Sequence, residues 1–68
     1  MIEKYIGRIV EIIYLDTNNK ITYRLVKVRG IRNGNVAVFC LKQKAPRSLI
    51  IKNILAAVPV KSEVKYHG

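Results

Sequence analysis

The chain has 68 residues, which is enough for one small domain, and its thirteen Lys and Arg against four Asp and Glu give a net charge of +9. Half of its residues are apolar, with many Ile and Val, so the composition excludes a disordered tail and favours a β-rich core. No uninterrupted apolar run of about 18 residues is present, and the start lacks the apolar core of a signal peptide. We therefore expect a cytoplasmic protein that does not insert into a membrane.

Closely spaced turn signals predict one domain over residues 1–60 and a polar C-terminal tail over residues 61–68. Residues 8–15 are too β-branched for a helix and predict a first strand, which ends at a polar turn over residues 16–19. Residues 20–28 predict a second strand. Its first half alternates, so one face carries Ile21, Tyr23 and Leu25, and the other carries Thr22 and Arg24.

Gly30 and the pair Asn33-Gly34 predict breaks before a third strand over residues 35–42, and Asn-Gly is a strong hairpin signal. Residues 43–46 are predicted to form a loop, because Pro46 cannot donate to a central ladder. A fourth strand is expected over residues 47–51. A single helical turn capped by Asn53 and a last strand over residues 58–60 complete the domain.

Five short strands joined by hairpins, with a one-turn helix before the last strand, predict an all-β fold. The expected architecture is a small five-stranded barrel of the SH3-like or Sm-like type. The OB-fold is the alternative, although its intervening helix has no clear place in this sequence. An Sm-like barrel also admits homo-oligomers formed by strand addition, for which the long apolar first strand would be the free edge.

The residues needed for enzymatic chemistry are missing from the sequence. Cys40 lies in an apolar run and is predicted to be a buried structural thiol. The only His is His67, next to the C-terminus, and the few acids are scattered. No nucleophile has a base at a useful spacing and no metal-ligand pattern occurs. We therefore expect a protein that is not an enzyme and that binds neither metal nor cofactor.

Residues 12–54 resemble the WYL domain, a small Sm-like or SH3-like barrel of bacterial regulators. The segment Ile12-Ile13-Tyr14-Leu15-Asp16 is similar to the opening strand of that family. Arg24-Leu25-Val26-Lys27 is similar to its second strand, with Val28 where the family has Pro. Arg47-Ser48-Leu49-Ile50-Ile51-Lys52-Asn53-Ile54 matches its final signature. The Trp-Tyr-Leu strand would fall on Val36-Ala37-Val38, which lacks both aromatic residues.

The resemblance implies a regulatory module that responds to a ligand or contacts nucleotides. Carried over by position, the ligand-binding residues would be Tyr14, Arg24 and Arg47. An Arg within an apolar strand can present a fixed fork to a phosphate or carboxylate. The alternative for Arg24 and Arg47 is structural, with the stem packed over the core and the head group paired to an acid or a carbonyl.

The excess of basic residues indicates a polyanionic partner, since charge of one sign opposes compaction. The candidate nucleic-acid-binding residues are Arg29, Arg32, Lys42 and Lys44, which are expected near one rim, and Tyr23 as a platform for base stacking. The alternative is that these cations solvate the surface and guard strand edges, and that the tyrosines belong to the core.

These observations predict a non-enzymatic binding module for nucleic acid, recognising the backbone or a single strand through a basic surface. The alternative is a regulatory module of WYL type that binds a small ligand or a protein and can be oligomeric.

Overall fold

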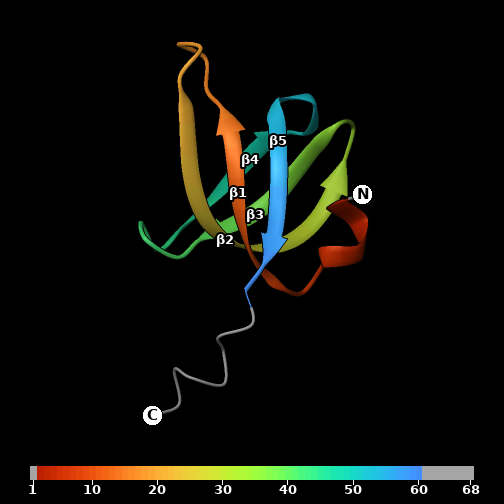
Figure 1. Cartoon of the computed structure of the whole chain (residues 1–68). Helices are drawn as coiled ribbons and strands as arrows, with labels where there is room; N and C mark the ends of the chain where they lie inside the picture. Colours follow the sequence, from red (N-terminus) through yellow and green to blue (C-terminus); the bar gives the residue numbers. More distant parts are fainter. Residues whose placement is uncertain (1, 61–68) are drawn as a thin grey trace.

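The computed structural model describes residues 2–60 and consists of one antiparallel sheet with two short 3₁₀ helices (Figure 1). No helix in this part of the chain is long and apolar enough to cross a membrane. The elements in chain order are η1 (Ile2–Tyr5), β1 (Ile9–Leu15), β2 (Ile21–Arg32), β3 (Asn35–Cys40), β4 (Ala45–Ile50), η2 (Ile51–Asn53) and β5 (Ile54–Pro59). The prediction of an all-β fold with a helical turn before the last strand is confirmed.

The strand order in the sheet is β4-β3-β2-β1-β5. The first four strands form a meander, and β5 returns to pair with β1. The sheet curves around the core, but β4 and β5 lie at its two ends and do not pair, so the sheet is not closed. Because β1 lies between β2 and β5, it has no free edge, and the expected strand addition through β1 is wrong.

The core follows the period-two alternation of the strands. The inward-facing residues are buried on β1, on the second half of β2 and on β3, and Ile2 from η1 and single residues of β4 and β5 complete the cluster. The buried residues are Ile2, Val10, Ile12, Tyr14, Val26, Val28, Val36, Val38, Cys40, Leu49 and Ile54. Cys40 is a free, buried thiol, as predicted.

The second strand is longer than predicted, because Gly30 does not end it. β2 continues to Arg32, and its register against β3 shifts between Val28 and Gly30. This β-bulge bends the strand and lets it belong to both halves of the curved sheet. The Asn33-Gly34 turn is present as predicted, with φ of 52° and 79° at its two residues.

The boundaries of the later elements also differ from the prediction. β3 ends at Cys40, and Pro46 belongs to β4, which is an edge strand and so loses no central ladder bond at a proline. η2 ends at Asn53 and begins after Ile50 without a side-chain cap, so the predicted Asn53 cap is wrong. β5 begins at Ile54, earlier than expected. The predicted polar tail lies outside the described residues.

Candidate functional site: a basic sheet surface and a groove beside β2

Charge is segregated along the chain. Between residues 20 and 60 every charged side chain is a Lys or an Arg. The acids of the described part, Glu3, Glu11 and Asp16, all precede β2. The positive charges of β2, of the β3–β4 turn, of β4 and of η2 are therefore not offset by any acid within the same segments.

The predicted nucleic-acid-binding cations are spread along β3, because Arg29 lies opposite its middle and the others lie toward its two ends. Arg32 pairs with Asn35 at the beginning of β3, next to the Asn33-Gly34 turn, and Arg29 lies in the bulge of β2. Lys42 and Lys44 lie in the β3–β4 turn, after the other end of β3. All four are exposed, but the structure does not gather them on one rim.

A further cation, Lys27, lies between Arg29 and the β3–β4 turn. It pairs with Phe39, and both Phe39 and Asn35 lie on the outward face of β3. We name as the basic band the exposed residues Lys27, Arg29, Arg32, Lys42 and Lys44. The band follows β3, whose six residues span about 20 Å at about 3.3 Å per residue. The cations of the band are therefore arranged along a line and are not gathered around one small site.

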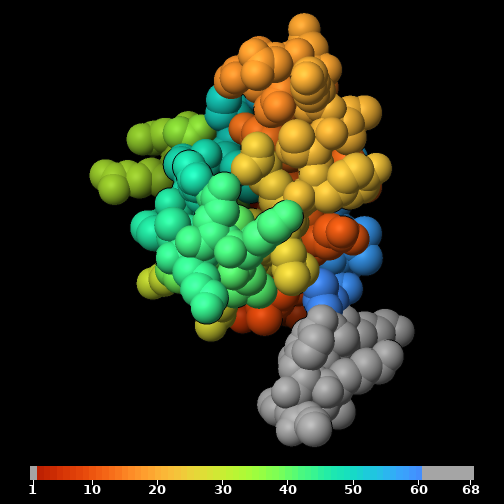
Figure 2. Space-filling model, turned by 90° about the vertical axis from the view of Figure 1, so that its left-hand side faces the viewer, coloured from red at the N-terminus to blue at the C-terminus, as the bar shows by residue number. Residues whose placement is uncertain are grey.

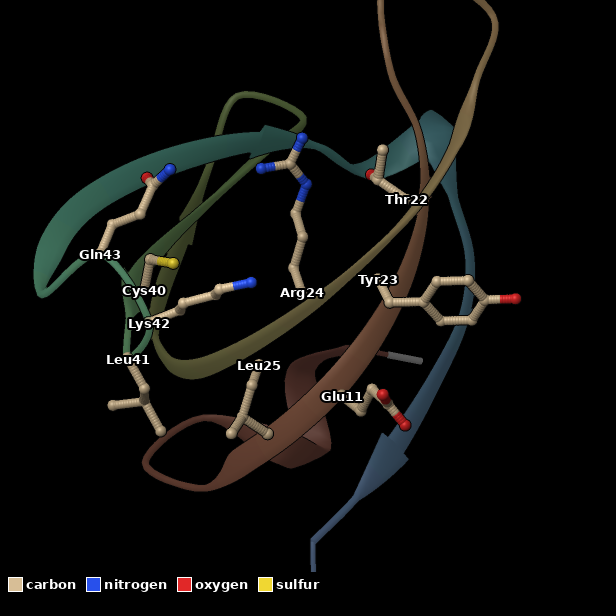
Figure 3. A pocket seen from close by; sticks show the side chains of 9 residues that line it. All are labelled: Glu11, Thr22, Tyr23, Arg24, Leu25, Cys40, Leu41, Lys42 and Gln43. Carbon is tan, nitrogen blue, oxygen red and sulfur yellow. The ribbon is translucent and has the colours of Figure 1, made fainter.

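A separate groove lies between the first half of β2 and the β3–β4 turn. In Figure 2 these two segments, gold and green, lie side by side on the face toward the viewer. The groove has a volume of about 810 Å³. Its lining residues are Glu11, Thr22, Tyr23, Arg24, Leu25, Cys40, Leu41, Lys42 and Gln43. Figure 3 shows Arg24 and Lys42 directed into this space, whereas Tyr23 points away from Arg24.

Arg24 is held at the inner wall of the groove by Tyr14. Its guanidinium carbon lies 5.1 Å from the centre of the Tyr14 ring, a cation–π contact. The Nε atom of Arg24 is buried and has no hydrogen-bond partner among the described residues. A buried donor without a partner is costly, so the groove favours an anion or another acceptor at this atom.

Two of the three residues implied by the family resemblance, Tyr14 and Arg24, are thus in direct contact. The third residue, Arg47, makes a different contact. It donates from Nε and Nη2 to Oε1 of Gln43, and Gln43 lines the groove. Arg47 therefore orients a neutral side chain at the groove and does not lie on the wall itself.

The site contains residues that sequence reasoning did not select. Lys27 belongs to the basic band. Its position in the alternation of β2 could have indicated that its side chain is exposed on the outer face. Gln43 and Leu41 line the groove because the β3–β4 turn lies beside the first half of β2, and no local pattern indicates that contact. Tyr23 is 68% exposed, as a stacking platform requires, and lies on the same outer face of β2 as Lys27, away from the groove side of Arg24.

Comparison of the chain with family models, with characterised proteins and with solved structures gives no match. The resemblance to the WYL domain and the SH3-like or Sm-like type of the sheet stay predictions.

Proposed function

We propose that this protein is a non-enzymatic nucleic-acid-binding module that contacts the phosphate backbone through the basic band. The observation that carries the proposal is the charge segregation, since no acid occurs between residues 20 and 60 and the exposed cations follow one strand. Phosphates recur at regular intervals along a nucleic acid, and a track of cations about 20 Å long matches such a ligand better than it matches one small anion.

The mode of binding follows from the residue types. The band consists of flexible Lys and Arg side chains with one half-buried aromatic residue, Phe39, among them. Contacts of this kind position a backbone and carry little sequence information. Binding should therefore depend steeply on salt and weakly on sequence.

The test is fluorescence anisotropy with labelled single-stranded DNA, duplex DNA and RNA of equal length, at low and at near-physiological salt. Reversal of three band charges in the triple variant Arg29→Glu, Arg32→Glu, Lys44→Glu should weaken binding by at least about tenfold. The slope of log K against log salt should become less steep by about 2 to 3, because each phosphate contact contributes about 0.7 to 0.9.

A matched control reverses the same number of charges elsewhere, in the triple variant Lys4→Glu, Arg8→Glu, Lys20→Glu. Lys4 lies in η1, Arg8 precedes β1, and Lys20 lies in the turn before β2. Both variants have the same net charge, so a specific loss in the first variant identifies the band. Equal losses in both variants would mean generic attraction of a basic protein to polyanions, and binding that survives the band variant would place the interface elsewhere.

A second function is favoured by one observation: the cationic side chains of Arg24 and Lys42 point into the groove. The volume of about 810 Å³ is in the range of small-ligand sites, and Arg24 offers a buried donor that no other described residue accepts from. A regulatory module of WYL type would bind an anionic metabolite or nucleotide here. Thermal-shift measurements with nucleotides and with small dicarboxylates, repeated on Arg24→Ala, would support this reading if a stabilising ligand loses its effect in the variant.

A further inference from the structure

The first half of β2 has a free edge within residues 2–60. Its pairing with β3 begins only at Val26, whereas its pairing with β1 extends back to Ile21. Residues 21–25 therefore have a neighbouring strand on the β1 side and none on the other side. In Figure 1 this part of β2, in gold, forms the outer boundary of the curved sheet above the β3–β4 turn.

The hydrogen bonds show which backbone groups point toward this open side. Val28 donates to the carbonyl oxygen of Arg8 at 3.0 Å and accepts from the N–H of Gly7 at 2.8 Å, so its groups point toward β1. The carbonyl oxygen of Leu25 instead accepts from the N–H of Leu41 at 3.1 Å, on the opposite side. By alternation, the N–H and C=O groups of Ile21 and Tyr23 also point toward the open side.

On the outer face, the side chains along this edge are not those that guard an edge against pairing, and its one charged residue is the inward-pointing Arg24. Ile21, Tyr23 and Leu25 are 57%, 68% and 37% exposed on the outer face. The β4 edge, by contrast, carries Pro46 and Arg47, which are residues that discourage pairing. An edge with an apolar outer face and one inward-pointing cation is suited to an additional strand that brings an acid to that cation.

We propose that the edge formed by residues 21–25 binds an extended acidic peptide segment of a partner protein, which adds to β2 as a sixth strand. Backbone groups of Ile21 and Tyr23 would bond to the added strand. Its outward side chains would be apolar, next to Tyr23 and its neighbours on the outer face. An inward side chain would be a carboxylate that reaches Arg24.

Charge complementarity selects this occupant. The inner side of the edge faces the ammonium group of Lys42 and the buried Nε of Arg24, which has no hydrogen-bond partner within residues 2–60, so an acidic side chain is favoured there. A second copy of this chain would bring another Arg24 and a net charge of +9 to the same place. The site goes beyond the proposed nucleic-acid binding and shares only Lys42 with the basic band.

The probe is a labelled seven-residue peptide of alternating valine and glutamate, capped at both ends. Two control peptides are matched to it: one with glutamine in place of glutamate, and one N-methylated at alternate amides. We expect saturable binding by anisotropy at near-physiological salt. The glutamine peptide should bind about tenfold more weakly, because it loses the charge-assisted contact, and the N-methylated peptide should not bind measurably.

The protein variants separate the backbone from the side chains. Tyr23→Pro removes an N–H that points to the open side and leaves the β1–β2 bonds in place, so it should abolish binding. Tyr23→Thr keeps the N–H and should bind within about threefold of the unchanged protein. Arg24→Gln should remove the preference for glutamate over glutamine. If Tyr23→Pro fails to fold, the N-methylated peptide tests the same hydrogen bonds on the unchanged protein.

Several results would overturn the proposal. Equal binding of the N-methylated peptide would show that no strand is added. A self-association detected by sedimentation that Tyr23→Pro abolishes would make a second copy the occupant of the edge. Loss of peptide binding in the triple variant Arg29→Glu, Arg32→Glu, Lys44→Glu, with no loss in Tyr23→Pro, would assign the peptide to the basic band as a generic polyanion.

Discussion

Tyr14 joins two distant parts of the sheet through its hydroxyl oxygen. It is buried on β1, and its oxygen accepts a hydrogen bond of 2.9 Å from the N–H of Ile50 at the end of β4. Its ring also lies beneath the guanidinium of Arg24. One side chain therefore fixes the end of an edge strand and supports the inner wall of the groove.

Replacing Tyr14 by phenylalanine should lower the free energy of unfolding by about 0.5 to 1.5 kcal/mol, because the N–H of Ile50 loses its acceptor while the ring stays in the core. Thermal or urea unfolding measures the change, which corresponds to a lower Tm by roughly 2 to 12 °C in a domain of this size. Tyr23→Phe is the matched control. Its side chain is 68% exposed, so the same chemical change should leave the stability unaltered.

At the scale of the elements, two glycines of the β2–β3 hairpin have different roles. Gly34 has φ of 79° and supplies the left-handed conformation that the two-residue turn requires. Gly30 lies at the bulge without a positive φ, and a Cβ added there would meet no atom within 4 Å. The backbone conformation therefore requires glycine at position 34 but not at position 30.

Gly34→Ala should destabilise the protein by about 1 to 2 kcal/mol, since a Cβ is unfavourable at this φ even though space is available. Gly30→Ala should be neutral or stabilise by up to about 1 kcal/mol, because it restricts the unfolded chain without straining the strand. Chemical denaturation of the two variants in parallel checks the difference. A similar loss of stability in both would mean that the bulge also needs glycine.

At the scale of the whole molecule, charge opposes folding. The cations of β2, of the β3–β4 turn, of β4 and of η2 repel one another, and only Glu3, Glu11 and Asp16 offset this within the described residues. A small domain has little stability in reserve against such repulsion. A polyanion that binds the basic band would relieve it.

Stability should therefore rise with ionic strength. Between about 10 and about 150 mM sodium chloride the screening length falls from about 30 to about 8 Å, so repulsion between neighbouring cations weakens. We expect Tm to increase by a few degrees over this range. The triple variant Arg29→Glu, Arg32→Glu, Lys44→Glu should show a smaller increase. A Tm that does not change with salt would contradict the interpretation.

Local patterns were sufficient for the parts of this protein that depend on neighbouring residues. The β-branched residues of 8–15 and the alternation at the start of 20–28 predicted two strands, and Asn33-Gly34 predicted a hairpin that is present. The apolar context of Cys40 predicted its burial. Of the candidate site, the exposed cations were recognised because charge can be counted without knowing the fold.

Tertiary structure decided what depends on the curvature of the sheet. The bulge at Gly30 carries β2 into both halves of the sheet, and this leaves the edge of residues 21–25 free beside the β3–β4 turn. The groove, the contact of Arg24 with Tyr14 and the separation of Arg32 from Lys42 all follow from that path. A sequence determines turns and alternation locally, whereas the pairing length of each strand and the closure of a sheet depend on contacts between residues far apart in the chain.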